Sequence, residues 1–218
     1  MYLDSKVQTI HVENQSIQLF IPNQEEVKRV YKIHSEQNPN TPFPYWTQVW
    51  PSAMAMAQFI VQNPNYFLGK HVTELAAGLG LPSFVVAQFA DKVYCTDYLQ
   101  ETIDAMKQSV QHLEIQNISC ALVDWNNIPA DFPKTDIVLM SDINYNPADF
   151  DILLMVLTKF IDQDCLIILT TPQRLLAKPF IEKLMPYCKL SQEIVVNHQN
   201  KEVTISVFVL HNRLIQEV

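Results

Sequence analysis

The stretch 71-HVTELAAGLGLPS-83 decides the fold. Residues 71–75 form a largely apolar segment typical of a buried strand. Pro82 and Ser83 open an apolar helical segment, because proline suits the first turn of a helix, where its missing N–H is not needed. The loop between them holds Gly78 and Gly80, two of only 3 glycines in 218 residues, where average usage would give about 15. A chain so poor in glycine needs the backbone freedom of this loop, so the stretch predicts a strand, a tight turn and a helix.

The alternation of strand and helix continues beyond this stretch. Helices are expected around residues 103–113 and 147–160, and further apolar strands are expected at 92–96, 118–123, 136–141 and 165–170. Continuously apolar strands of this kind are typical of a parallel sheet that is covered on both faces.

The C-terminal part has a different pattern. A helix containing Leu175, Leu176, Phe180 and Leu184 is followed by two long strands, at about 188–196 and 202–210. The short polar loop between these strands predicts an antiparallel hairpin. We therefore expect an α/β fold with a doubly wound, mostly parallel seven-stranded sheet that ends in an antiparallel hairpin.

The N-terminal residues 1–40 are predicted to form an extension that packs on a single globular domain of residues 41–218. Alternating apolar residues over 7–21 predict a β-hairpin, and residues 24–34 predict a short helix. The proline- and tryptophan-rich segment 36–51 reads as an ordered loop, after which Ser52 is expected to cap a helix.

Composition excludes several kinds of partner. The net charge is −8, whereas a protein that binds nucleic acid normally shows a basic surplus or stripe. The chain has no apolar signal core and no run near the ~18 apolar residues of a membrane span, so we expect a cytoplasmic protein. Cys95, Cys120 and Cys165 lie in apolar runs and are expected to be buried free thiols. With no C-x-x-C motif and no ligand spacing among the histidines, we expect no metal site.

Acidic and aromatic residues follow the second and third predicted strands of the sheet. In an open α/β sheet, ligands bind outside the carboxyl ends of the strands. Asp97 ends the second strand, 17 residues after Gly80, where a carboxylate can accept two hydrogen bonds from a ribose diol. Asp124 and Trp125 follow the third strand and could contact an adenine. These residues predict a nucleoside-binding site.

Two classes of nucleoside cofactor remain open at this point. The pattern Gly78-x-Gly80-x-x-Ser83 is close to the dinucleotide-binding motif G-x-G-x-x-G/A, although such a loop can also be only a tight turn. Pro82 speaks against a dinucleotide, because a pyrophosphate needs backbone N–H donors at the start of the helix. The terminal hairpin also speaks against it, since a dinucleotide fold would continue with parallel units.

The motifs 44–60, 74–83, Asp97-Tyr98, Asp124-Trp125 and 141-SDINY-145 together resemble methyltransferase family sixteen. This is a seven-strand, S-adenosylmethionine-dependent group. It includes protein-lysine methyltransferases that act on chaperones, elongation factors and an electron-transfer flavoprotein subunit. The resemblance covers about residues 40–210, with each motif at the end of the expected strand.

The resemblance implies a set of site residues. Asp142 and Tyr145 match the family's Asp-x-x-Tyr pattern and would face the incoming nucleophile as the catalytic residues. The aromatic region 42–50 could form one lip of the acceptor slot. Cofactor contacts are implied for residues around the ends of the first four strands and before the Ser52 helix: Trp50, Glu74, Ala76, Ala77, Gly78, Gly80, Asp97, Tyr98, Asp124, Trp125 and Ser141.

Other roles for some of these residues stay open. Asp142 could cap the helix that follows it, and Trp46, Trp50, Trp125 and Tyr145 could be plain packing residues. One departure from the family is Ala76, which stands where the family has its first loop glycine. If this position needs a positive φ, alanine costs about 1 kcal/mol or more.

The resemblance predicts an enzyme that N-methylates a lysine of a protein substrate and converts S-adenosylmethionine to S-adenosylhomocysteine. One alternative is a small-molecule N-methyltransferase with a nicotinamide-like amine acceptor. Another is a non-catalytic binding module, which Ala76 would favour, and a third is an NAD-dependent oxidoreductase. The sequence indicates no oligomeric state.

Overall fold

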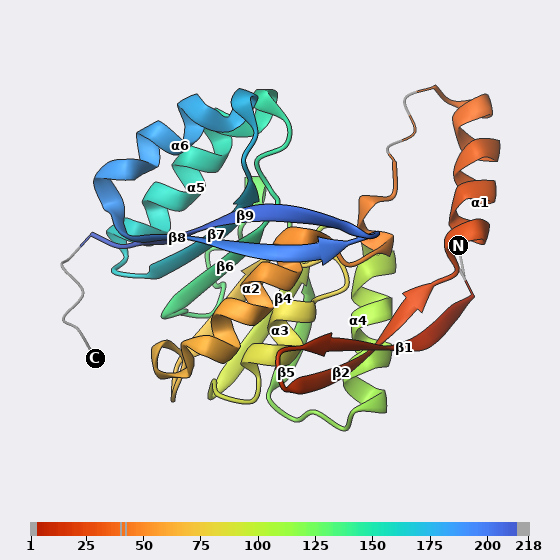
Figure 1. Cartoon of the computed structure of the whole chain (residues 1–218), viewed down its shortest axis with the longest axis horizontal. Helices are drawn as coiled ribbons and strands as arrows, with labels where there is room; N and C mark the ends of the chain where they lie inside the picture. Colours follow the sequence, from red (N-terminus) through yellow and green to blue (C-terminus); the bar gives the residue numbers. More distant parts are fainter. Residues whose placement is uncertain (1–3, 40, 42, 213–218) are drawn as a thin grey trace.

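A seven-stranded sheet forms the centre of the computed structural model, which describes residues 4–39, 41 and 43–212 (Figure 1). The strand order is β5-β4-β3-β6-β7-β9-β8. Five strands are parallel: β3 (His71–Leu75), β4 (Lys92–Asp97), β5 (Ile118–Leu122), β6 (Ile137–Ser141) and β7 (Leu166–Pro172). The hairpin of β8 (Cys188–His198) and β9 (Lys201–Leu210) adds to β7 in the antiparallel direction. The predicted doubly wound sheet with its antiparallel end is confirmed.

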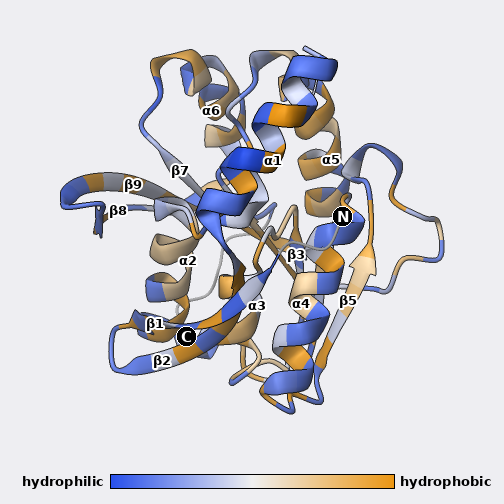
Figure 2. Ribbon diagram, turned by 90° about the vertical axis from the view of Figure 1, so that its right-hand side faces the viewer, coloured by the Kyte–Doolittle hydropathy of each residue, from blue (hydrophilic) through white to orange (hydrophobic). Residues whose placement is uncertain are grey.

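Both faces of the sheet are buried, as the continuously apolar strands predicted. Along β6, Val138 and Met140 belong to one hydrophobic cluster and Leu139 belongs to the other, because successive strand residues point to opposite faces. Figure 2 shows hydrophobic residues alternating with hydrophilic ones along the helices that flank the sheet. The face of Leu139 is covered by α2 (Pro51–Gln62), α3 (Leu81–Val86) and α4 (Gln100–His112), and the other face by α5 (Phe150–Asp162) and α6 (Lys178–Leu184).

The N-terminal hairpin packs onto the domain. Strands β1 (Ser5–Val12) and β2 (Gln15–Pro22) form a separate antiparallel pair. Four apolar side chains of the pair, Val12, Ile17, Leu19 and Ile21, are buried in the same cluster as α2, α3 and α4. The predicted hairpin is therefore confirmed.

Helix α1 (Gln24–Gln37) follows the hairpin and projects from the body as an arm (Figure 1). Its side chains are mostly polar (Figure 2), and Val27 is its one buried residue among those described. The predicted helix exists and is three residues longer than the expected end at His34. Asn23 caps it by accepting from the N–H groups of Glu25 and Glu26.

Three local predictions differ from the structure. Trp50, not Ser52, is the N-cap of α2, and Pro51 is the first residue of that helix, where its missing N–H costs nothing. The segment predicted as one helix from Pro147 divides into a 3-10 turn and α5. Leu175 and Leu176 lie in a 3-10 turn before α6 and are 90% and 73% exposed. The 3-10 turns are Tyr45–Thr47, Pro64–Tyr66, Trp125–Asn127, Pro147–Asp149, Leu175–Ala177 and Met185–Tyr187.

The cysteines are free thiols in the described structure. Cys95 and Cys165 are buried as expected, and Cys120 is only half-buried. Among the described residues, no helix has the length and apolar character needed to cross a membrane.

Candidate functional site

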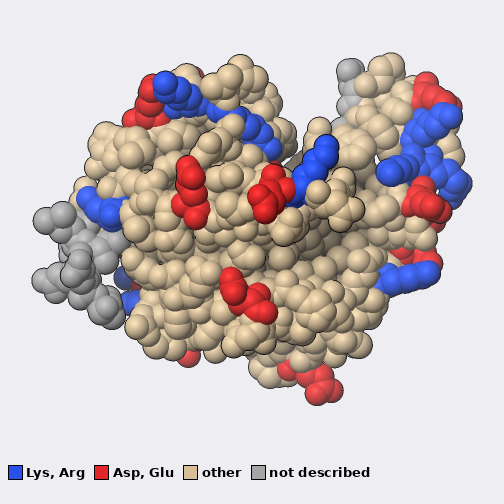
Figure 3. Space-filling view, in the orientation of Figure 1, with Lys and Arg blue, Asp and Glu red and all other residues tan. Residues whose placement is uncertain are grey.

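A cavity of about 650 Å³ opens at the carboxyl ends of the parallel strands. Its walls are the loops that follow β3, β4, β5 and β6, together with the segment 43–50 that leads into α2. The space-filling view shows the molecule hollowed between its body and the N-terminal arm (Figure 3). This is the place that the order of strands predicts for a ligand in an open α/β sheet.

Nearly all the residues that the sequence singled out line this cavity. The exception is Glu74, which is buried beneath it. The lining residues among those predicted are Trp50, Ala76, Ala77, Gly78, Gly80, Asp97, Tyr98, Asp124, Trp125, Ser141, Asp142 and Tyr145.

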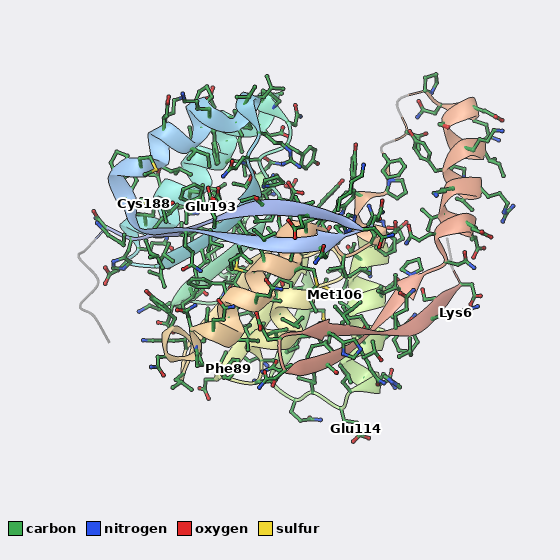
Figure 4. All side chains as sticks on the ribbon, viewed as in Figure 1. Lys6, Phe89, Met106, Glu114, Cys188 and Glu193 are labelled. Atoms are coloured by element: carbon green, nitrogen blue, oxygen red, sulfur yellow. The ribbon has the colours of Figure 1, made fainter. Side chains whose placement is uncertain are left out.

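The loop after β3 has the backbone geometry that its glycines suggested. Gly78 and Gly80 have φ values of 56° and 74°. A Cβ on Gly80 would lie 2.8 Å from Sγ of Cys95 and 3.1 Å from Sδ of Met106. Met106, which Figure 4 labels, is fully buried. Ala76 also has a positive φ of 53°, so the position where the family has glycine does carry the strain expected of alanine.

The Asp97 carboxylate joins two of the cavity's loops. Its Oδ2 accepts from the N–H of Gly78 at 3.0 Å, and its Oδ1 accepts from the N–H of Leu99 at 3.1 Å. Burial raises the pKa of this carboxyl above its ordinary value, and the backbone hydrogen bonds work against the rise. Hydrogen bonds with the side chain of Thr102 and the backbone of Tyr98 also lower this pKa, so Asp97 is fixed at the point where the β3 and β4 loops meet.

The side chain of Glu74 makes buried hydrogen bonds within the domain. Its Oε2 accepts from both the N–H (2.9 Å) and the hydroxyl (2.6 Å) of Ser83. Complete burial raises the pKa of this carboxyl to about 8, so it is protonated at neutral pH. Glu74 does not line the cavity, because its side chain joins β3 to the first turn of α3. Its contact with the cofactor stays a prediction.

Residues after β4 and β5 form a second wall. Oδ1 of Asp124 accepts from the backbone N–H (2.9 Å) and the side-chain amide (2.8 Å) of Asn126. Asp124 thereby caps the 3-10 turn that begins at Trp125. Tyr98 is 59% exposed across from this turn. The wall offers two aromatic rings and a carboxylate fixed at one oxygen, a combination that suits a purine with an exocyclic amine.

An aromatic wall lies on the side of the 43–50 segment, as the predicted acceptor lip requires. The ring of Tyr45 lies 4.9 Å from Phe43, 5.9 Å from Trp50 and 5.7 Å from Tyr145, measured between centroids. The indole N–H of Trp50 donates to the carbonyl of Tyr45 at 2.7 Å, and its ring stacks on His198 at the tip of the β8–β9 hairpin. Trp50 is therefore held from two sides while it faces the cavity.

Asp142 is paired with a cation that the sequence analysis missed. Nη1 of Arg174 donates to its Oδ1. Burial raises the pKa of the Asp142 carboxyl, whereas the guanidinium of Arg174 lowers it. The alternative role of Asp142 as a helix cap is wrong, because Asn146 caps the following turn. Arg174 carries no motif, and its only sequence signal is its position just after a strand of the sheet.

Comparisons with known proteins agree with this geometry. The model of the lysine methyltransferase family matches residues 44–186, which is well over half of the chain. Histone-arginine methyltransferase METTL23 of Mus musculus is 31% identical over 115 residues, covering 50% of this chain and 46% of METTL23. Protein N-terminal and lysine N-methyltransferase EFM7 of Cryptococcus neoformans is 30% identical over 125 residues, covering 51% and 42%. The chain thus spans about half the length of these curated relatives.

Solved structures share the fold. The T. thermophilus 16S rRNA N2 G1207 methyltransferase RsmC, in complex with AdoMet and guanosine, matches 98% of this chain and 52% of its own with a TM-score of 0.65 at 12% identity. N-methyltransferase NodS from Bradyrhizobium japonicum matches 72% of this chain and 95% of its own with a TM-score of 0.57 at 10% identity. The sheet is that of a class I, Rossmann-like methyltransferase. From its family match and its fold, the chain belongs to the lysine methyltransferase family, a group of S-adenosylmethionine-dependent methyltransferases.

Proposed function

We propose that this protein transfers a methyl group from S-adenosylmethionine to the amine of a lysine in a protein substrate. The observation that carries the proposal is one cavity with two kinds of wall. Since the strand order is β5-β4-β3-β6-β7, Asp97 and Asp124 lie on one side of the β3 loop. Asp142 and Arg174, which follow β6 and β7, lie on the other. The first side suits a nucleoside and the second suits an acceptor.

The chain's own residues fit the cofactor. Four carboxylates and one guanidinium line the cavity among the described residues, namely Asp97, Asp124, Asp142, Asp149 and Arg174. This surplus of negative charge favours a cationic sulfonium. In our proposal Asp97 receives the ribose hydroxyls, Tyr98, Asp124 and Trp125 hold the adenine, and Trp50 with the 76–80 loop holds the amino-acid part. The cofactor supplies an activated methyl group.

Methyl transfer itself needs alignment rather than a covalent enzyme intermediate. The acceptor ammonium would first give its proton to water, and the nitrogen would then bond to the methyl carbon as the carbon–sulfur bond breaks. S-adenosylhomocysteine would be released as a neutral thioether, and the product would be a methylated ammonium. A lysine must enter this step as the neutral amine, although its ordinary pKa is about 10.4. Burial of the amine inside the cavity, and the positive charge of the cofactor when it is bound, would both favour the neutral form.

The pairing of Asp142 favours lysine over arginine as the acceptor. A guanidinium presents its N–H donors as a fixed fork that is best matched by both oxygens of one carboxylate. Oδ1 of Asp142 is already bonded to Arg174, so the pair does not offer that match. An amine needs a single acceptor and walls along its aliphatic stem, and Tyr45 and Tyr145 supply such walls.

The rim of the cavity favours a polypeptide over a small molecule. Tyr45 and Tyr145 are 52% and 55% exposed, and Phe43 is 39% exposed. Exposed apolar groups that gather at one place are typical of interaction surfaces. Relatives named as protein methyltransferases support the same interpretation.

The test uses purified protein, S-adenosylmethionine labelled with tritium in its methyl group, and lysate proteins of the source organism. We expect label in a protein band and, after acid hydrolysis, in methyllysine. Asp142→Ala should abolish the label and keep cofactor binding. Label in methylarginine would contradict the lysine acceptor, and label only in the small-molecule fraction would favour the small-molecule alternative. Cofactor binding without any transfer would favour a binding module.

A further inference from the structure

Arg174 is the one positively charged residue that lines the cavity in the described part of the chain. It stands two residues beyond the end of β7. Its side chain is 35% exposed, while that of its partner Asp142 is 14% exposed. The side chain of Arg174 therefore extends from the protein surface to a carboxylate that is mostly buried.

Asp142 is held through both its backbone and its side chain. Its φ of 59° is in the left-handed region, and its N–H donates to the carbonyl of Thr170 at 2.9 Å. Its Oδ1 accepts from Arg174. Both partners come from β7 and the residues just after it, so this strand decides where the carboxylate points.

Resting on the proposed function, we propose that Arg174 is a positioning residue for methyl transfer, which keeps Asp142 ionised and aims its free Oδ2 at the acceptor amine. No described residue bonds to Oδ2, so this oxygen can accept one N–H from the incoming amine. A carboxylate buried without a counter-ion takes up a proton instead. Without Arg174, Asp142 would take up a proton more readily, and the resulting hydroxyl would hold the amine in the wrong orientation.

Several ionisable groups lie near Asp142. Tyr145 lies on the same loop, and Tyr98, Tyr45 and Asp149 surround Tyr145. Burial raises the pKa of Tyr98 and Tyr145 above the usual value of tyrosine, so both phenols remain neutral between pH 6 and 9. Within that interval the rate also depends on the acceptor amine and on Glu74, whose pKa is raised to about 8. The ratio of the variant rate to the natural rate with one acceptor removes both contributions and reports on Asp142.

The experiment measures initial rates of tritium-methyl transfer to lysate protein between pH 6 and 9 for the natural protein, Arg174→Met and Arg174→Lys. An adjacent cation lowers the pKa of an aspartate by about 1–3 units. We therefore expect Arg174→Met to transfer more slowly than the natural protein, with the largest deficit at pH 6 and the smallest at pH 9. Arg174→Lys keeps the charge and should stay within about threefold at every pH. Lys178→Met, which removes a cation paired with Glu182 outside the cavity, is the matched control and should change nothing.

Cofactor binding, measured by calorimetry with S-adenosylmethionine, separates this proposal from the function on which it rests. Binding without transfer in the natural protein would overturn the proposed function. With transfer established, an equal fall of the Arg174→Met rate at every pH, or no fall, would overturn the role of Arg174. If Arg174→Met fails to fold, the Arg174→Lys variant is measured instead, as its rate divided by that of the natural protein. A ratio that is constant from pH 6 to 9 supports the proposal. A ratio that falls toward pH 6 overturns it.

Discussion

Replacing Gly80 by alanine should destabilise the protein by an amount that the structure divides into two parts. The φ of 74° lies in the left-handed region, where a Cβ costs about 1–2 kcal/mol. The added Cβ would also lie 2.8 Å from Sγ of Cys95, 3.1 Å from Sδ of Met106 and 3.3 Å from a ring carbon of Phe84. Overpacking of this kind costs about 1–3 kcal/mol. We therefore expect Gly80→Ala to lower the free energy of unfolding by about 2–5 kcal/mol.

The assay is urea unfolding, with Gly69→Ala as the matched control. Gly69 has a similar φ of 67° and no atom within 4 Å of an added Cβ, so it measures the backbone cost alone. With a slope of about 2 kcal/mol per molar urea, the midpoint should fall by about 1–2.5 M for Gly80→Ala and by less than about 1 M for Gly69→Ala. The double variant Gly80→Ala/Cys95→Ala lacks the Cys95 sulfur that lies nearest the added Cβ. Its loss of unfolding free energy should be smaller than the sum of the losses of the two single variants. Equal midpoints for Gly80→Ala and Gly69→Ala would refute the steric argument.

Three further predictions concern the carboxylates and the alanine of the site. Asp97→Asn places an amide N–H₂ opposite a backbone N–H donor, so we expect a loss of about 1–3 kcal/mol in stability and at least tenfold weaker S-adenosylmethionine binding by calorimetry. Glu74 keeps its proton up to a pKa of about 8 in the folded state but loses it near 4.5 when unfolded. Stability should therefore fall as pH rises between these values. Glu74→Gln keeps an oxygen that can accept from Ser83. Its free energy of unfolding in urea should rise relative to that of the natural protein from pH 5 to pH 8. A constant difference between the two free energies would contradict the raised pKa of Glu74. Ala76→Gly relieves about 1 kcal/mol of left-handed strain, partly offset by the freer unfolded chain, so thermal unfolding should show equal or higher stability and calorimetry should show undiminished cofactor affinity.

The fold could be predicted because local patterns and the global topology agree. Continuously apolar strands between helices imply a covered parallel sheet, and the polar loop at 197–200 marks the final hairpin. The need for glycine at positions 78 and 80 could also be predicted. Both have positive φ, and a chain with 3 glycines shows where it needs them.

The interactions across the cavity could not be predicted from the sequence. Arg174 meets Asp142 only because β6 and β7 are neighbours in the sheet, and nothing near Arg174 in the sequence marks that contact. Glu74 was expected to contact the cofactor because it stands in a binding motif. The hydrogen bonds to Ser83 that hold its side chain beneath the cavity depend on how tightly α3 approaches β3, a distance that one sequence does not contain.

The most direct test of the account is calorimetric titration of the purified protein with S-adenosylmethionine, S-adenosylhomocysteine and NADH. The site described here predicts micromolar binding of both sulfur compounds, no binding of NADH, and at least tenfold weaker binding of the sulfur compounds to Asp97→Asn. Binding of NADH alone, or equal binding of S-adenosylmethionine by the natural protein and Asp97→Asn, would contradict it.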